Sequence, residues 1–255
     1  MLTVREPAVA GQFYTGDPYE LAREVEDYLA QAEQPIAQPQ GIIVPHAGHV
    51  FSGPVAAKAY KTLRATKRVV LMGPSHFVPV RGMAAPAAQV WRTPLGLVDI
   101  DTETIERLGL PRSDYPHAGE HSLEVQLPFL QEQLEPGWVL LPLLVGHASA
   151  EEVADILEGF LADPDSVVVL STDLSHYLPY DDAASQDAVT AELIVNRNWQ
   201  QIGNDDACGA YPLRGMLLAA QRLDMPVKLL DLRSSGDTAG PRDRVVGYGA
   251  FTVGA

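Results

Sequence analysis

The segment GIIVPHAGHVFSG, residues 41–53, places an unbroken apolar run, a proline and two histidines directly before a helical pattern. The run GIIV shows no alternation with polar residues, which is typical of a strand buried on both faces of a parallel sheet. We expect the following helix to begin with Ser52 as its N-cap and with Pro54 in its first turn. A buried strand, a short loop and a helix form the unit from which α/β folds are built, so this stretch indicates the fold class.

The same alternation recurs along the rest of the chain. Further apolar runs predict strands at residues 68–72, 138–145, 166–171 and 227–232, and a last strand at 245–253 is expected at an edge of the sheet. Helical patterns cover residues 122–134, 149–163, 180–196 and 207–223, with Pro128 expected to kink the first of them or to end its first segment. Residues 80–100 have no helical period and predict a β-hairpin.

Composition and the absence of internal boundaries indicate the domain organisation. The chain has 255 residues, of which 46% are hydrophobic and 20% are charged, so it can bury a sizeable core. The sequence contains no linker or low-complexity tract, which predicts one domain over residues 1–255. The predicted fold is therefore a single α/β domain with a mainly parallel central sheet flanked by helices.

Charge and hydropathy exclude several classes of partner. The net charge of −15 would repel a phosphate backbone, so we expect no nucleic-acid binding. No apolar run approaches the ~20 residues of a membrane helix, and the N-terminus has no apolar stretch typical of a signal peptide. Cys208 is the single cysteine, so no intramolecular disulfide can form, and a cytoplasmic protein is expected.

Three histidines follow predicted strands at the point where each strand ends. His46 and His76 come after the first two strand runs, and His176 comes after the run at 166–171, with Asp173 three residues before it. Each of them alone could be an ordinary loop residue. Ligands of open parallel sheets bind outside the carboxyl ends of the strands, so the joint placement favours a functional cluster at one edge. Neutral imidazole binds Zn, Fe, Cu and Ni, which makes His46 and His76 candidate metal ligands.

Residue pattern alone leaves the remaining ligands open. Cys208 begins the predicted helix at 207–223, where the helix dipole would lower the thiol pKa and favour the metal-binding thiolate. A lone cysteine is, however, commonly an inert buried thiol, and a carboxylate could take its place as a ligand. His49 could coordinate beside His46 through the H-x-x-H spacing or could line the pocket, and His147 is a further pocket candidate.

A series of motifs along nearly the whole chain resembles the Memo family, whose bacterial and archaeal branch is known as AmmeMemoRadiSam system protein B. The matching motifs are REPAVAGQFY at 5–14, VPHAGHVFSGPVAAKAY at 44–60, GPSH at 73–76, EHSLEVQLPFL at 120–130, STDLSHY at 171–177, CGAYPLRGML at 208–217 and SSGD at 234–237. Together the motifs are highly specific, whereas GPSH alone would be a weak signal. The resemblance implies a fold akin to that of the class III extradiol dioxygenases, which bind a non-haem Fe(II) through two histidines and a carboxylate.

The same resemblance implies roles for individual residues. One transition metal ion would be bound, with Fe(II) as the first expectation and Cu or Zn as alternatives. Its ligands would be His46, His76 and Cys208, and Asp173 and His176 would form a catalytic acid/base pair in the same pocket. Further pocket residues would be His49, His121 and Tyr211. A thiolate in place of the dioxygenase carboxylate softens the site and shifts its preference toward Cu(I) or Zn.

Two classes of function follow from these expectations. The first is a metal-dependent, dioxygenase-like oxidoreductase in which His176 transfers protons, oriented by Asp173. The second is a non-catalytic protein that binds a peptide or small molecule and works with radical-SAM and AMMECR-type companions, as the family label implies. Aromatic residues expected near the rim of the pocket suit either class: Phe51, Tyr177 and Tyr211. The sequence supports a site better than it supports turnover.

Overall fold

Parallel strands form the centre of the sheet in the computed structural model, which describes residues 2–33 and 38–254 and so excludes both ends of the predicted 1–255 domain. Across the sheet the parallel strands are β2 (Gly41–Val44), β8 (Ser166–Ser171), β3 (Arg68–Pro74) and β7 (Val139–Val145). Apart from the first residues of β3 and β7 they are buried throughout, as their uninterrupted apolar runs predict. The carboxyl ends of β2, β8 and β3 therefore meet side by side at one edge.

The C-terminal strand β11 (Val245–Val253) lies inside the sheet and makes it mixed. It pairs antiparallel with β2 on one side and with β10 (Val227–Ser234) on the other. The expectation of an edge position for residues 245–253 was wrong, because β10 forms that edge. Burial explains the order: β11 is buried along almost its whole length, whereas β10 exposes Lys228, Leu229 and Leu230. At the opposite edge the short strand β4 (Met83–Ala84) pairs antiparallel with β7.

Helix α2 (His49–Tyr60) begins four residues earlier than the sequence pattern suggested. Its N-cap is Gly48, and the first helical amide, of His49, donates to the carbonyl oxygen of Phe13 at 2.7 Å. Ser52, the expected N-cap, instead lies within the helix and donates its hydroxyl to the carbonyl oxygen of Ala47 at 2.8 Å. The N-terminal segment thus provides an acceptor for the first amide of the helix. Local capping rules do not include such a long-range contact.

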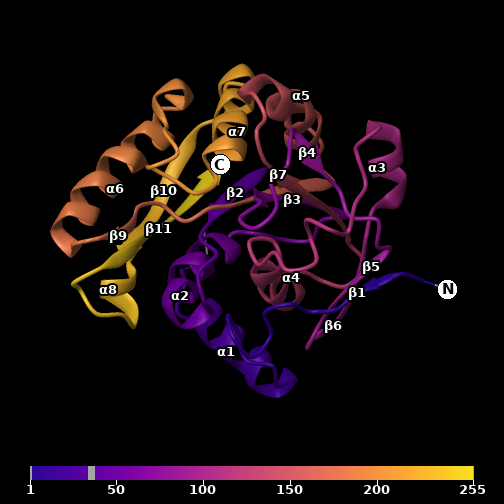
Figure 1. Cartoon of the computed structure of the whole chain (residues 1–255), viewed down its shortest axis with the longest axis horizontal. Coiled ribbons are helices and arrows are strands. Elements are labelled where there is room, and N and C mark those ends of the chain that lie inside the picture. Colours follow the sequence, from indigo (N-terminus) through magenta and orange to yellow (C-terminus); the bar gives the residue numbers. More distant parts are fainter. Residues whose placement is uncertain (1, 34–37, 255) are drawn as a thin grey trace.

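The remaining helices cover the two faces of the sheet. They are α1 (Pro18–Ala30), α3 (Thr102–Leu108), α4 (Leu127–Gln133), α5 (Ala150–Leu161), α6 (Tyr180–Val195), α7 (Ala210–Arg222) and α8 (Ser235–Thr238), with short 3₁₀ turns η1 (Glu124–Gln126) and η2 (Trp199–Gln201). Helices α5 and α7 pack on each other at one side of the sheet, and α1, α2 and α4 pack together at the other (Figure 1). Pro128 falls in the first turn of α4, where a missing amide proton costs nothing, and the segment before it is the 3₁₀ turn η1.

A second, three-stranded sheet lies beside the main one (Figure 1). It contains the predicted hairpin, with β5 (Val90–Thr93) antiparallel to β6 (Gly96–Asp99), and β1 (Val4–Arg5) joins β5 in parallel. A further short strand, β9 (His176–Leu178), pairs with β11 next to the carboxyl end of β8. Within residues 2–33 and 38–254, no helix has the length and apolar character needed to cross a membrane.

Candidate metal centre

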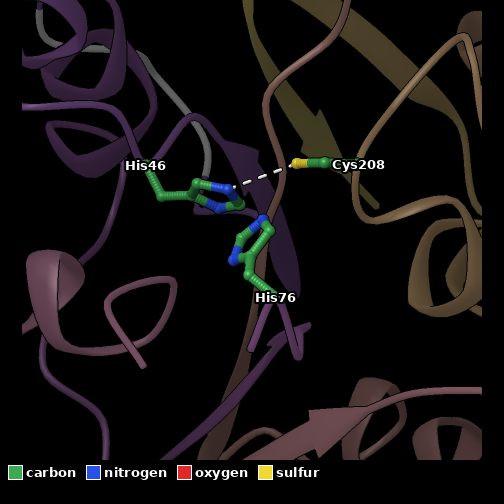
Figure 2. A group of neighbouring side chains, drawn as sticks. All are labelled: His46, His76 and Cys208. Carbon is green, nitrogen blue, oxygen red and sulfur yellow. Dashed lines mark hydrogen bonds between the residues drawn. The ribbon is translucent and has the colours of Figure 1, made fainter. Parts of the chain in front are cut away.

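His46, His76 and Cys208 meet at the edge where the parallel strands end. His46 lies in the loop after β2, His76 in the loop after β3, and Cys208 shortly before α7. One potential ligand atom from each residue lies within 4.8 Å of the atoms from the other two. Figure 2 shows both rings turning a nitrogen toward the space beside the Cys208 sulfur. Ligand atoms of a tetrahedral site lie roughly 3.3–3.7 Å apart, so small shifts would let these three side chains hold one metal ion.

Hydrogen bonds determine which nitrogen of His46 carries its proton. Its Nδ1 atom lies 2.8 Å from the hydroxyl oxygen of Ser171. That hydroxyl already donates its only proton to the carbonyl oxygen of Ser122, at 2.6 Å, so it can only accept from the imidazole. The His46 proton is therefore on Nδ1, and Nε2 presents a lone pair, 3.2 Å from the sulfur of Cys208. Burial, together with the neighbouring imidazoles, lowers the pKa of His46, which keeps the ring neutral and able to coordinate.

Glu120 is a buried carboxylate next to His76 that sequence reasoning missed. Its Oε2 atom accepts from the His76 amide at 2.6 Å, and its Oε1 atom lies 2.9 Å from Nδ1 of His76. Oε1 also accepts from the amides of His121 and Ser122, both at 2.9 Å. Burial alone would raise the pKa of Glu120, but these hydrogen bonds and the attraction of a protonated His76 outweigh it and lower the pKa to about 2. The available signal was its position in EHSLEVQLPFL, directly before the predicted pocket residue His121.

The Cys208 thiol differs from its expected state. Burial raises its pKa to about 12, and the nearby Asp173 carboxylate adds to the shift. Helix α7 begins only at Ala210, and the Gly209 amide donates to the hydroxyl of Thr172 at 2.9 Å. The prediction that a helix start lowers this pKa was therefore wrong for the metal-free protein. The thiol is protonated at neutral pH, and a bound metal would have to displace its proton.

Asp173 supports His46 rather than His176. Its Oδ1 atom accepts from the His46 amide at 2.7 Å, and its Oδ2 atom lies 4.0 Å from Nε2 of His46. His176 is exposed on β9, with Nδ1 at 2.8 Å from the carbonyl oxygen of Leu174, and the described residues show no hydrogen bond between its ring and Asp173. Burial raises the pKa of the Asp173 carboxyl.

His121 completes the group of imidazoles at this edge. Its ring stacks on that of His76, with centroids 4.7 Å apart, and lies edge-on to that of His46 at 5.5 Å. Phe13 covers it from the N-terminal segment, at a centroid distance of 4.4 Å. Its buried Nδ1 atom lies 3.3 Å from Oε1 of Glu120 but makes no hydrogen bond to any described residue. His121 therefore lies against both candidate ligands.

His49 and Tyr211 have surroundings of their own. Nε2 of His49 lies 2.9 Å from the carbonyl oxygen of Val125, and its ring packs in the core against Phe129 at 5.0 Å. The H-x-x-H spacing does not bring His49 into either group of possible metal ligands among the described residues. Tyr211, on the first turn of α7, packs its ring against that of His147, at a centroid distance of 5.4 Å.

Comparison with known proteins identifies the family. A family model described as Memo-like protein matches residues 5–252. This chain belongs to the Memo family. A MEMO1 family protein of Aquifex aeolicus is 34% identical over 261 residues, covering 97% of this chain and 98% of the relative. MEMO1 family proteins of Methanopyrus kandleri and Methanosarcina mazei are 35% and 34% identical, over 97% and 99% of this chain and 98% and 100% of the relatives.

One ion pair in this Memo-family chain links two of its motifs. Arg5, from the first motif, donates to Glu124 of EHSLEVQLPFL, with Nη1 and Oε2 2.6 Å apart and both side chains buried. Glu124 also accepts from the Tyr14 hydroxyl at 2.6 Å and from the amides of Ala8 and Val9. These contacts hold residues 5–14 against η1. Phe13 of the same motif packs on His121, so the first motif lies next to the candidate metal centre.

Proposed function

We propose that this chain binds one transition metal ion through His46, His76 and Cys208 and uses it in a redox reaction. The observation that carries the proposal is the convergence of two imidazoles and a thiol at the carboxyl ends of three neighbouring strands. The lone pair on Nε2 of His46 makes this residue ready to coordinate. Three protein ligands would leave positions open for substrate or dioxygen.

The donor set suits several metals. Two imidazoles and a thiolate form a site softer than the two-histidine, one-carboxylate set of non-haem iron oxygenases. Fe(II) is our first expectation, from the dioxygenase resemblance, while the thiolate favours copper or zinc. When bound, an iron or copper ion would supply one-electron chemistry and polarise a coordinated oxygen atom.

The side chains around the centre would transfer protons and hold the metal ligands in place. Cys208 must lose its thiol proton for its sulfur to bind, and Asp173 holds the His46 loop in place through the His46 amide. His176 is exposed on β9 near Asp173 and His46, and it is the group we assign to proton transfer with a bound ligand. Its Nδ1 faces the Leu174 carbonyl, which leaves Nε2 for the ligand.

Metal content and oxygen consumption test this function together. Protein purified without oxygen should contain about one iron or copper per chain, and oxygen uptake in the presence of a reductant should require that metal. The His176→Ala variant should keep its metal and lose turnover, whereas Cys208→Ser should lose both. A wild-type chain that takes up no transition metal would refute the proposal.

A binding role is the second candidate, favoured by two exposed aromatic side chains next to His76 and His176. Phe77 and Tyr177 are 67% and 63% exposed, unusual for aromatic side chains beside a polar cluster. Tyr177 also adopts a left-handed backbone conformation, with φ of 58°, and strain of this kind is concentrated at functional sites. A peptide or small molecule would then bind against these aromatic side chains. Metal-loaded protein without oxygen uptake, and with His176→Ala indistinguishable from wild type, would favour this role.

A further inference from the structure

Glu120 is surrounded by proton donors. Its two carboxylate oxygens face three backbone amides, of His76, His121 and Ser122, and two imidazole nitrogens: Nδ1 of His76 lies 2.9 Å and Nδ1 of His121 lies 3.3 Å from Oε1. Arg5 holds the backbone of the same residue by donating to the Glu120 carbonyl oxygen at 2.8 Å. The residue is 2% exposed, so water does not compete for these hydrogen bonds. This carboxylate is held rigidly and acts as an acceptor only.

An acceptor at this position determines the tautomer of His76. Nδ1 of His76 lies 2.9 Å from Oε1 of Glu120 and must carry a proton to form that bond. A neutral imidazole has a single ring proton, so Nε2 is left with its lone pair. Figure 2 shows that the His76 nitrogen farther from its backbone points toward His46 and Cys208. The hydrogen bond to Glu120 therefore turns the coordinating nitrogen toward the proposed metal position.

We propose that Glu120 is a positioning residue that fixes His76 as the Nδ1–H tautomer before any metal arrives. The inference rests on the proposed metal site and adds the device that prepares one of its ligands. Ser171 does the same for His46, so the two imidazoles are prepared by separate acceptors. Carboxylate–histidine–metal arrangements of this kind orient ligands and typically change metal affinity about 10–100-fold when disrupted.

The competing role for Glu120 is that of a ligand. His76, Glu120 and His121 also form a group whose possible ligand atoms lie within 4.8 Å of one another. A cation bound at Oε1, however, would face the N–H groups of His121 and Ser122, both 2.9 Å away and both directed at the same oxygen. The positive ends of those dipoles oppose cation binding. The surroundings of Glu120 thus favour support of His76 over coordination.

Long-range proton–nitrogen NMR of the metal-free wild type tests the tautomer directly. In the neutral ring, His76 should show a protonated Nδ1 and a bare Nε2. A neutral His76 ring with its proton on Nε2 would overturn the proposal. This measurement needs no variant and no metal, so it stands even if a substitution prevents folding.

Three substitutions then separate positioning from general support of the fold. Glu120→Leu removes the acceptor at similar volume, and Glu120→Gln keeps an amide oxygen that can accept from Nδ1. In protein without metal, Glu120→Leu should allow the His76 proton to occupy either ring nitrogen, while His46 stays protonated on Nδ1. Ser171→Ala should allow the His46 proton to occupy either ring nitrogen, while His76 stays protonated on Nδ1. Glu120→Gln should keep both tautomers. Loss of both in Glu120→Leu would indicate general disruption and would overturn the proposal.

Titration with Co(II), a spectroscopic probe, gives the second readout. Glu120→Leu should weaken Co(II) binding about 10–100-fold, and Glu120→Gln should weaken it less. An equal loss in both variants would identify Glu120 as a ligand and overturn the proposal. If the tautomers behave as expected and wild type binds no Co(II), the positioning role is supported while the proposed metal function fails.

Discussion

Nε2 of His46 lies 3.2 Å from the sulfur of Cys208, although 162 positions separate the two residues along the chain. The loop after β8 brings the two residues together because Asp173, in that loop, forms hydrogen bonds with both of them. Asp173 accepts from the His46 amide at 2.7 Å, and its own amide donates to the Cys208 sulfur at 3.3 Å. Pairing of β2 with β8 brings the His46 loop next to Asp173, so the sheet order itself assembles this half of the centre.

Replacement of Cys208 should remove metal binding. We expect Cys208→Ser to lower affinity for Zn(II) or Cu(I) by more than the about 10–100-fold typical of losing a supporting residue, because a serine hydroxyl stays protonated and binds soft metals poorly. His46→Ala and His76→Ala should behave alike. The control is His49→Ala, which should retain its metal at reduced thermal stability, since His49 packs in the core. Equal metal content in wild type and Cys208→Ser, measured by mass spectrometry, would exclude the cysteine as a ligand.

Metal affinity should depend on pH through the Cys208 thiol. With its pKa raised to about 12, the thiol is protonated throughout the neutral range, so each bound ion releases one proton. The association constant should therefore rise about tenfold per pH unit between about pH 7 and 9. Competition titrations at several pH values, with the chelator's own protonation corrected, would measure this slope. A flat profile would indicate that the sulfur stays protonated or unbound.

Acid should destabilise the fold through Glu120. Its pKa is about 2 in the folded chain against 4.5 ordinarily, so the unfolded chain binds the proton more readily. The difference corresponds to about 3 kcal/mol of stability, which is fully present above pH 4.5 and is lost as pH falls toward 2. Urea unfolding of wild type and Glu120→Gln should show the gap between them shrinking from pH 6 to pH 3. A gap that stays constant would contradict this linkage.

The buried pair of Arg5 and Glu124 should be costly to break. Glu124→Ala would leave the Arg5 guanidinium buried without its partner, which typically costs about 3–5 kcal/mol. Chemical denaturation should report this loss, together with freer motion of residues 5–14. The matched control is Lys67→Gln, which breaks the exposed pair with Asp165 and should leave the denaturation midpoint unchanged. Similar midpoints for both variants would count against the structural role of the first pair.

The chain should have no useful affinity for DNA or RNA. Its net charge of −15 offers no basic surface to replace the counterions of a phosphate backbone. Fluorescence anisotropy with labelled duplex and single-stranded oligonucleotides at physiological salt should show no binding at micromolar protein. Sub-micromolar binding would contradict this expectation.

Much of the architecture follows from local sequence pattern. The runs at 41–44, 68–72 and 166–171 became buried parallel strands, because a strand covered on both faces must be apolar at every position. Parallel strands end at a common edge, so His46 and His76 could be placed together from the sequence. The cysteine was harder to place. Residue pattern left Cys208 among several possible ligands, and only the family motif singled it out.

Tertiary structure decided what depends on contacts between distant segments. The interior position of β11, the early start of α2 and the attachment of Asp173 to His46 each involve partners far apart in the sequence. The raised pKa of Cys208 and the lowered pKa of Glu120 likewise arise from burial and from hydrogen bonds that form only in the folded chain. Hydrophobic periodicity is a local property of the sequence, so it predicts where individual strands and helices form. The charge state and orientation of a side chain depend on its three-dimensional surroundings, which is why Glu120 emerged only from the fold.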